Sequence, residues 1–287
     1  MNEHEVSIGP LMKAARKFRK FNQSDVAHAI GCSQSALSKM EHNLLVPSAP
    51  QWFLFARFTA IPPETLETGF IDRHSKVKFN SDQVSLGFKI PKRYRSFRSQ
   101  KVREIYPFLQ YLEKKMTPPL HTEYMNTLSL DPEFFIDFDN LINFQLILDT
   151  VDYFIKLGKN THEDIREIVQ LGQNEVYWDH YGIEWKALTD VNTVLKEFAK
   201  EQVFFQTDFQ LKVDMTLDKT TISYYPEYHL KQLSPNIKRE TIDFLNSYRE
   251  ATLENLIRMT LGKSVRFELM PQVSTSLFGA RFLLKTA

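Results

Sequence analysis

GCSQSALSKMEHN, residues 31–43, contains few apolar side chains for a stretch that has the pattern of a folded helix. Cys32, Leu37 and Met40 are the three positions that can point inward. The remaining residues would cover the opposite face with small hydroxyls, an amide and one lysine, whereas an ordinary exposed helix carries mostly Glu and Lys. Such a face suits an edge rich in hydrogen-bond donors and acceptors, so we interpret it as a recognition surface.

Residues on the amino-terminal side of this stretch predict two further short helices. An amphipathic helix over residues 8–20 is followed by one over residues 23–30, for which Asn22 is a good N-cap. Gly31 is the residue type best able to leave that second helix in a left-handed conformation. Ser33 then caps a third helix, which makes the quoted stretch a turn followed by a helix.

Residues on the carboxy-terminal side predict two more helices. Aromatic residues recur within a short span and can cover the far side of the domain as a fourth helix: Trp52, Phe53, Phe55 and Phe58. Pro62–Pro63 begin a short fifth helix.

This pattern resembles the lambda-repressor/Cro-type, or XRE-like, helix-turn-helix over about residues 8–68. The resemblance rests on Gln23, Val26, Ala27, Gly31, Cys32, Ser33, Leu37, Ser38, Met40, Glu41, Asn43 and Pro47. Ala27 lies where the family has a small residue at the helix crossing, and Ser38 with Glu41 matches its Ser-x-x-Glu element. Asn43 departs from the glycine of many members, but Asn is the next best residue for a positive φ.

The resemblance implies binding to double-stranded DNA, with the third helix entering the major groove by its N-terminus. Seven residues are predicted to contact DNA: Gln23, Ser33, Gln34, Ser35, Ser38, Lys39 and Asn43. Gln34, Ser35 and Ser38 lie where the family contacts base edges, and Gln can pair with adenine. Gln23 and Asn43 match positions that usually touch phosphates, while the lysine can reach base or backbone.

Charge is divided unevenly along the 287 residues, a length typical of one large or two ordinary domains. Residues 1–104 carry 17 Lys and Arg against 9 Asp and Glu, and the rest carries 19 against 26. This indicates a basic module with a polyanionic partner, joined to an acidic module with another role. Basic residues are expected on or near the outer surface of the first helix and its last turn: Arg16, Lys17, Arg19 and Lys20. Lys17 and Lys20 are expected at most to meet phosphates.

The sequence also excludes several classes of protein. A single cysteine excludes an internal disulfide framework and a zinc cluster built on cysteine. The amino terminus lacks the apolar stretch of a signal peptide, and no apolar run is long enough to predict a membrane span. We therefore expect a cytoplasmic protein in a reducing compartment.

Residues 72–104 connect the two modules and carry ten basic residues against three acidic ones. They can form an arm along the DNA backbone or a solvated linker, and the sequence does not decide between these. Within them, Tyr94, Ser96 and Arg98 resemble the propionate-binding motif of haem nitric-oxide sensor domains. Because the helix-turn-helix occupies the place of that family's axial-histidine segment, we interpret the match as accidental.

Residues 105–287 predict an α+β unit in which helices precede a small antiparallel sheet. Helices are predicted over residues 101–115, from Asp139 or Asn140 onward, from the Thr161–Asp164 capping box onward, over residues 191–202, and from Ser234 to near Gly262. Alternation over residues 205–215 and 221–225 predicts a β-hairpin, and two closing strands are predicted near 265–269 and 278–284. In overall shape, this unit distantly resembles ligand-sensing domains of regulators, including the 4-vinyl reductase-like and arabinose-regulator-like types.

This half of the chain has no recognisable catalytic pattern. HExxH, GxSxG, GxxxxGK[ST] and GxGxxG are absent, so we predict no enzyme, no cofactor and no metal site. His180 near Asp179 and Glu184 could ligate a metal, but an exposed histidine is the more common case. Aromatic residues can line an apolar pocket, although a core or dimer surface is more usual for them: Tyr177, Trp178, Tyr181, Trp185, Tyr224 and Tyr225.

We therefore predict an N-terminal all-α helix-turn-helix domain (1–71), a basic linker (72–104) and a C-terminal α+β sensory or oligomerisation domain (105–287). The predicted function is that of a sequence-specific DNA-binding transcription regulator. It is expected to act as a homodimer whose interface lies in the C-terminal half, and a small apolar ligand is a further expectation there. The alternatives are a DNA-tethered scaffold that binds a protein partner, and a haem or small-molecule sensor.

Overall fold

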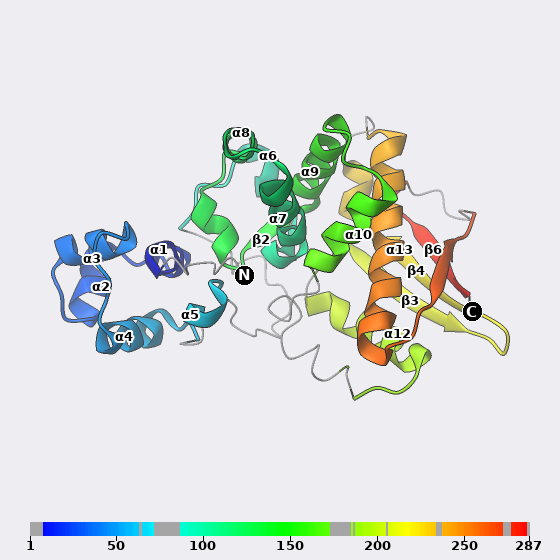
Figure 1. Ribbon diagram of the computed structural model, residues 1–287, viewed down its shortest axis with the longest axis horizontal. Helices are drawn as coiled ribbons and strands as arrows, with labels where there is room; N and C mark the ends of the chain where they lie inside the picture. Colours follow the sequence, from blue (N-terminus) through cyan, green and yellow to red (C-terminus); the bar gives the residue numbers. More distant parts are fainter. Residues whose placement is uncertain are drawn as a thin grey trace.

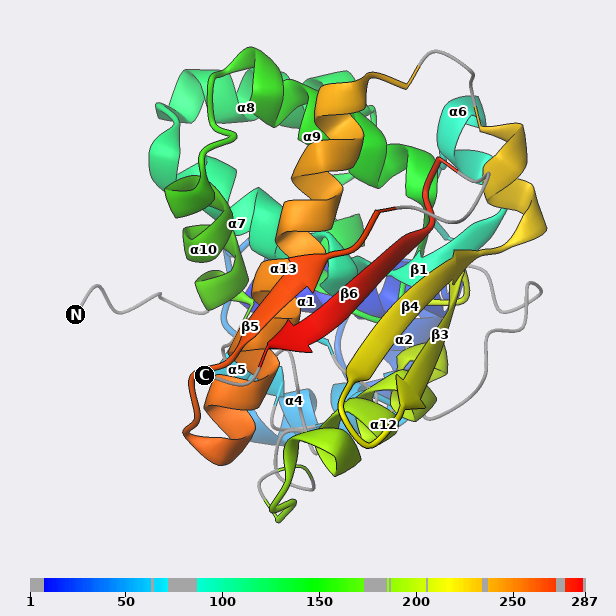
Figure 2. The same cartoon turned by 90° about the vertical axis from the view of Figure 1, so that its right-hand side faces the viewer.

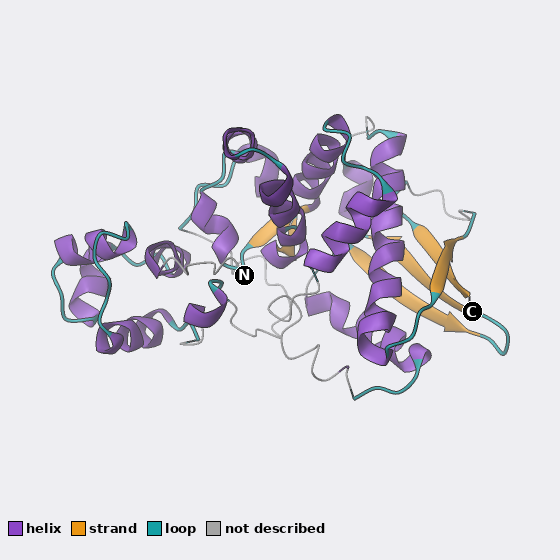
Figure 3. Ribbon diagram, viewed as in Figure 1, coloured by secondary structure: helices purple, strands orange, loops and turns teal. Residues whose placement is uncertain are grey.

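The computed structural model of the chain describes residues 8–62, 65–71, 87–172, 185, 187–204, 206–233, 237–271 and 277–285. These residues form two units with separate hydrophobic cores, and the units lie side by side along the long axis (Figure 1). The N-terminal unit is helical, whereas the larger unit combines helices with a small antiparallel sheet (Figure 3), which confirms the predicted fold class. Among the described helices, none is long and apolar enough to cross a membrane.

Helices of the N-terminal unit follow the predicted order. They are α1 (Ile8–Phe18), α2 (Gln23–Ala29), α3 (Gln34–Glu41), α4 (Ala49–Thr59) and α5 (Thr65–Thr68). Asn22, Ser33 and Ser48 cap α2, α3 and α4 by accepting backbone N–H groups of the first turn. The core beneath them is fully buried and apolar: Leu11, Met12, Val26, Leu37 and Phe55.

The larger unit is mostly helical in its first part. Its helices are α6 (Lys92–Arg95), α7 (Tyr106–Lys115), α8 (Pro118–Leu128), α9 (Phe144–Lys156), α10 (His162–Leu171), α12 (Val191–Glu201) and α13 (Arg239–Leu261). Its 3₁₀ turns are η1 (Val102–Glu104), η2 (Pro132–Ile136), η3 (Gln202–Phe204) and η4 (Tyr228–Gln232). The predicted capping box between Thr161 and Asp164 begins α10, and Gly262 ends α13 in a left-handed conformation.

An antiparallel sheet closes the end of the larger unit that lies farthest from the N-terminal unit. Its described strands are β3 (Phe209–Met215), β4 (Thr220–Pro226), β5 (Arg266–Leu269) and β6 (Ala280–Lys285), in the order β3-β4-β6-β5. The predicted hairpin is β3–β4, and the predicted closing strands are β5 and β6. Helix α13 lies across one face of this sheet (Figure 2). Ile222, Phe267 and Phe282 of the sheet are buried in the same core as Leu253 and Ile257 of α13.

Three starts of helices differ from the prediction. The longest helix, expected to open at Ser234-Pro235, begins at Arg239. The helix expected from Asp139 or Asn140 begins at Phe144 with Asn143 as its N-cap, because Leu141–Asn143 forms strand β2. This strand pairs with β1 (Arg98–Lys101), and strands this short have no period that a sequence reveals. For the same reason the helix expected from residue 101 begins only at α7. Helix α8 has no counterpart among the predicted elements.

Residues 87–104, expected in the basic linker, belong to the larger unit. Phe88, Ile90 and Tyr94 lie in its core, and β1 is part of its smaller sheet. Arg93 Nε lies 2.5 Å from Asp149 Oδ2, so the arginine forms an ion pair within the larger unit. Residues 72–86, where the choice between a DNA-bound arm and a linker arose, lie outside the described residues. We propose that the boundary between the units falls within them.

Ion pairs join the N-terminal unit to the larger one. Lys13 Nζ lies 2.5 Å from Glu133 Oε1, and Lys17 Nζ lies 2.6 Å from Asp131 Oδ2. Lys17 Nζ also lies 5.4 Å from the ring centroid of Phe88. Through these contacts, one face of α1 packs against η2 and against Asp131, the residue before η2.

Backbone contacts reinforce this packing. The Ile71 N–H donates to the carbonyl oxygen of Ile136 at 3.0 Å, and the Phe138 N–H donates to that of Ile71 at 2.9 Å. Gly87 packs directly against α1, where an added Cβ would lie 1.6 Å from the carbonyl oxygen of Lys17. The two units therefore meet at a surface with no room for a side chain at residue 87.

Candidate functional sites

The N-terminus of α3 is fixed by its cap and by the core beneath it. Ser33 Oγ accepts the Ala36 N–H at 3.1 Å, and Gly31 makes the preceding turn with a φ of 70°. Leu37 and Met40 are buried, as predicted. Cys32 is half-buried against the same core, which raises the pKa of its thiol through loss of solvation. The first turn of α3 is thereby held with its polar face outward.

The residues predicted to read base edges lie on this outward face. Gln34, Ser35 and Lys39 are exposed, and Ser38 is half-exposed. Within the part of the chain that the structure describes, none of these four side chains has a hydrogen-bond partner. Ser33 is exposed too, but its hydroxyl already accepts the capping bond. The face is therefore polar and unpartnered, as a DNA-reading face must be before it binds.

Gln23, predicted to touch phosphate, is part of a buried network. Its Nε2 donates to Glu41 Oε2 at 2.8 Å, and Arg16 donates to the same carboxylate from Nε at 2.5 Å and Nη2 at 2.9 Å. Glu41 is only 3 % exposed. Arg16 was expected near the outer surface, but it points inward because Glu41 needs a buried cation. Gln23 and Arg16 thus tie α1 and α2 to the end of α3.

Asn43 also has a structural partner that sequence reasoning missed. Its φ of 56° confirms the predicted positive value, and its Oδ1 accepts the Gly9 N–H at 2.8 Å. Gly9 lies so close to α3 that an added Cβ would be 2.6 Å from the carbonyl oxygen of Met40. Asn43 therefore joins the end of α3 to the start of α1, and its predicted phosphate contact would be an additional role.

Of the other basic residues expected near the outer surface, Arg19 and Lys20 are exposed as predicted, whereas Lys17 is half-buried against the larger unit. Lys17 faces Asp131 of the larger unit, and Arg19 Nε donates to the carbonyl oxygen of Thr59 at 3.0 Å. Lys20 is exposed and remains available for phosphate. Lys13 was not singled out, because its partner is 120 residues away in the chain.

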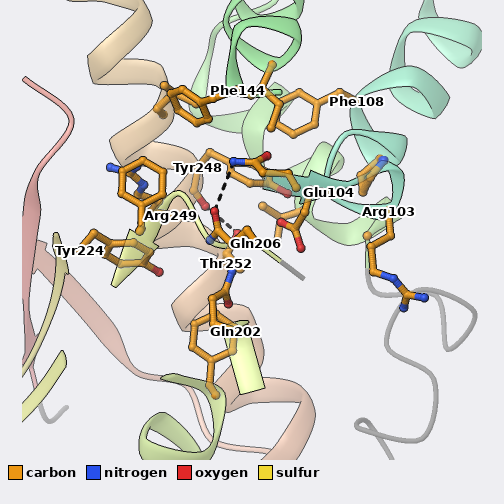
Figure 4. A pocket seen from close by; sticks show the side chains of 18 of the residues that line it. Arg103, Glu104, Phe108, Phe144, Gln202, Gln206, Tyr224, Tyr248, Arg249 and Thr252 are labelled. Atoms are coloured by element: carbon orange, nitrogen blue, oxygen red, sulfur yellow. Dashed lines mark hydrogen bonds between the residues drawn. The ribbon is translucent and has the colours of Figure 1, made fainter. Parts of the chain in front are cut away.

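The larger unit contains a cavity of about 130 Å³ between its helices and its sheet (Figure 4). Aromatic rings form much of its wall, including those of Phe108, Phe144 and Phe209. Polar side chains also reach it from η1, η3, β4 and α13: Glu104, Gln202, Tyr224, Tyr248 and Arg249. Such a mixture of apolar walls and a few polar groups is typical of small-molecule sites.

Loss of solvation shifts the pKa of two of these groups. Loss of solvation raises the pKa of Glu104 to about 7, although the nearby Arg103 and Lys101 oppose the shift. Loss of solvation also lowers the pKa of Arg249 to about 10. Both charged forms are therefore less stable in the protein than in water.

Ser99, Asp208 and His229 form a second buried polar cluster, beside this cavity. Asp208 Oδ1 accepts hydrogen bonds from Ser99 Oγ and from His229 Nε2. The hydrogen bond to Asp208 raises the pKa of the His229 imidazole. In a catalytic triad the histidine would lie between the other two and would activate the serine. Here the carboxylate lies between them, so the cluster does not have the geometry of an activated nucleophile.

The remaining sequence candidates do not converge on a site. Tyr94 donates to Asp149 and is buried while Ser96 is exposed, so the haem-type motif does not share one surface. His180 and the aromatic residues at 177, 178 and 181 lie outside the described residues. No group of three or more metal-binding side chains occurs among the residues that the structure describes.

Residues 12–66 match the family described as Helix-turn-helix, in its XRE form. The match runs from α1 into α5 and includes all of α2, α3 and α4. This segment is an XRE-like helix-turn-helix, which supports a DNA-binding transcription regulator. No curated protein matches the chain.

Proposed function

We propose that the protein regulates transcription by sequence-specific binding of α3 in the major groove. The observation that carries this proposal is the outward, unpartnered face of α3 above a buried core. In it, Gln34, Ser35 and Ser38 contact base edges, and Lys39 reaches base or backbone. The residues at the helix ends, Gln23, Ser33 and Asn43, lie at the DNA backbone, assisted by helix N-termini.

The substitution Gln34→Ala tests whether α3 contacts base edges. Loss of a good base contact costs about 1–3 kcal/mol at the preferred sequence, and binding to other sequences stays nearly unchanged. Selection of sites from a random DNA pool is therefore expected to show relaxed preference at one position in each half-site. The slope of log affinity against log salt concentration on non-specific DNA is expected to match that of the parent protein.

Lys20→Gln is the matched control, because Lys20 is exposed and outside α3. It is expected to lower the salt slope by about one unit and to leave the selected sequence intact. If Gln34→Ala selects the same site as the parent protein, with the parent's preference at every position, then α3 is not the element that reads the sequence.

We further propose that the larger unit senses a small molecule in its cavity. The support is a cavity of about 130 Å³ with aromatic walls and polar groups from several elements. The sequence led us to expect an apolar ligand. Glu104 and Arg249 in the wall favour a ligand that has polar ends as well as an apolar body.

A continuous set of contacts connects this cavity to the helix-turn-helix. Arg103 lines the cavity, and its guanidinium lies 5.7 Å from the ring centroid of Phe138. The adjacent Val102 N–H donates to the carbonyl oxygen of Asn140 at 2.8 Å, and Asn140 Nδ2 donates to that of Phe134 at 2.7 Å. Phe134 belongs to η2, on which α1 is seated. A ligand that shifts η1 therefore has a physical route to the DNA-binding unit.

A thermal-shift screen of chemically diverse metabolites with the full chain tests the sensing proposal. A ligand of the cavity is expected to stabilise the fold by mass action and to change the affinity for DNA. Ile147→Trp, which adds bulk at the cavity wall, is expected to abolish both effects. No stabilising compound, together with unchanged regulation in the filled variant, would favour the scaffold alternative instead.

We also propose that the protein binds DNA as a homodimer. The observation in favour is a concentration of exposed apolar residues between α3 and the end of α4: Leu44, Leu45, Val46, Phe53, Leu54 and Phe58. These exposures support an interface on the N-terminal unit, and not in the C-terminal half as expected from the sequence. Light scattering is expected to show a dimer that the double variant Leu44→Ser/Val46→Ser dissociates. Leu217→Ser, at a fully exposed hairpin residue, is the control that should remain dimeric.

A further inference from the structure

Arg249 is a half-buried cation of α13 with no carboxylate partner among the described residues. Its guanidinium carbon lies 4.4 Å from the ring centroid of Phe209 and 4.9 Å from that of Tyr224. Nη1 donates to Asn246 Oδ1 at 3.2 Å and to the carbonyl oxygen of Phe278 at 3.1 Å. Among the described residues Nε and Nη2 have no hydrogen-bond acceptor, and Arg249 lines the cavity, which leaves donors that can bind an anion such as a carboxylate.

Glu104 is a half-buried acidic group on the opposite side of the same cavity in Figure 4. Its carboxyl group has no hydrogen bond or ion pair within the described ranges. The cations nearest to it have other contacts, because Lys101 Nζ lies 2.7 Å from Asp139 and Arg103 stacks over an aromatic ring. Asp208 adds a like charge. The wall therefore lacks a cation that directly pairs with Glu104.

Glu104 and Arg249 do not neutralise each other. They form no ion pair with each other, and both lie near Tyr224, whose pKa Arg249 acts to lower and Glu104 acts to raise. They are therefore separated groups of opposite sign at one cavity. A buried charge without a partner is costly, and a ligand that supplies an opposite charge to each removes the cost at both ends.

We propose that the cavity binds a small zwitterion with its acid and base at opposite ends, such as a straight-chain ω-amino acid. Its carboxylate pairs with Arg249 and its ammonium group with Glu104, while the methylene chain lies between Phe108 and Phe144. An α-amino acid carries both charges around one carbon, so its charges lie closer together than those of an ω-amino acid. This inference rests on the proposed sensing function and names its class of ligand.

The volume of the cavity limits the ligand to a small one. A cavity of about 130 Å³ is close to the engineered cavity of about 150 Å³ that holds benzene. A short chain with two charged ends fits this space, whereas a nucleotide, a haem or a sugar phosphate does not. The chain length that spans from Arg249 to Glu104 is expected to bind best.

Titration calorimetry with the full chain tests the proposal against a series of β-alanine, γ-aminobutyrate, δ-aminovalerate and ε-aminocaproate. The best of these is compared with the carboxylate and the amine of the same chain length. Each truncated analogue is expected to bind at least about thirtyfold more weakly, since it leaves one buried charge without its partner. Comparison of analogues requires no variant, so a folding defect cannot obscure the result.

Two measurements assign the ends of the ligand. Glu104→Gln is expected to reduce binding of the ω-amino acid to the level of the carboxylate analogue, and Arg249→Lys to weaken both carboxylates. Binding of the ammonium group favours ionised Glu104, whose pKa is raised to about 7 by loss of solvation. Roughly half a proton is therefore expected to be released per ligand at pH 7, measured in buffers of different ionisation enthalpy. The carboxylate analogue is expected to release none.

Each result separates this inference from the sensing function. Equal affinity for the carboxylate and the ω-amino acid, or no binding by any member of the series, would overturn the zwitterion. A cavity ligand of another class, found in the thermal-shift screen, would then leave sensing intact. Failure of both the series and the screen, with normal regulation by Ile147→Trp, would overturn sensing itself.

Discussion

Replacement of Glu41 by alanine is expected to lower the free energy of unfolding of the helix-turn-helix unit by about 3–5 kcal/mol. The Glu41 carboxylate accepts hydrogen bonds from Arg16 and Gln23, and its side chain is 1 % exposed. Without it, the Arg16 guanidinium stays charged beside an apolar core with its side chain only 14 % exposed. The cost is that of a buried charge that has lost its partner.

Hydrogen exchange of peptides from α1 to α4 measures this loss in the full chain. Ser35→Ala, at an exposed position of the same helix, is the control and is expected to change stability by less than about 0.5 kcal/mol. Arg16→Met combined with Glu41→Leu is expected to recover much of the stability, because apolar pairs often replace buried ion pairs at little cost. Equal effects of Glu41→Ala and Ser35→Ala would show that the carboxylate is not a structural anchor.

Replacement of Gly87 by alanine is expected to separate the two units and to abolish the response of DNA binding to a cavity ligand. The added Cβ would lie 1.6 Å from the carbonyl oxygen and 2.4 Å from the carbonyl carbon of Lys17, both in the backbone of α1. A helix backbone cannot yield locally, so α1 must move away from η2. The ion pairs of Lys13 and Lys17 would then open, since they span the same surface.

Small-angle X-ray scattering is expected to show a larger radius of gyration for Gly87→Ala, while its affinity for DNA without ligand stays close to that of the parent. Gly158→Ala is the control, because an added Cβ there meets nothing within 4 Å and only the positive φ is strained. An unchanged radius together with an intact ligand response would contradict this route of coupling.

Within the DNA-binding unit, local signals were enough to predict the helices. Asn22 and Ser33 cap the helices expected of them, and Gly31 adopts the left-handed conformation. Caps and turns depend on residues within one helical turn of each other, so a sequence reveals them directly. The alternation that predicted β3 and β4 is local in the same sense, because a strand buries every second residue. The short strands β1 and β2 have too few residues for such a period.

In the candidate site, the exposure of residues was predictable from the sequence, but their hydrogen-bond partners were not. Gln34 and Ser35 were expected to be exposed, and they are, because the spacing of Leu37 and Met40 decides which face of α3 turns inward. The partners of polar residues were not predictable. Gln23 bonds to Glu41, 18 residues away, and no period or cap connects the two.

Only the tertiary structure brought together the groups at the cavity and at the surface between the two units. Lys13 meets Glu133 across 120 residues, and η1, β4 and α13 contribute Glu104, Tyr224 and Arg249 to one cavity. The sequence by itself determined which segments become helices and strands and which faces of them are buried, because apolar spacing and caps act over a few residues. The partner of a charged side chain depends instead on which distant element packs against it, and only the folded chain determines that.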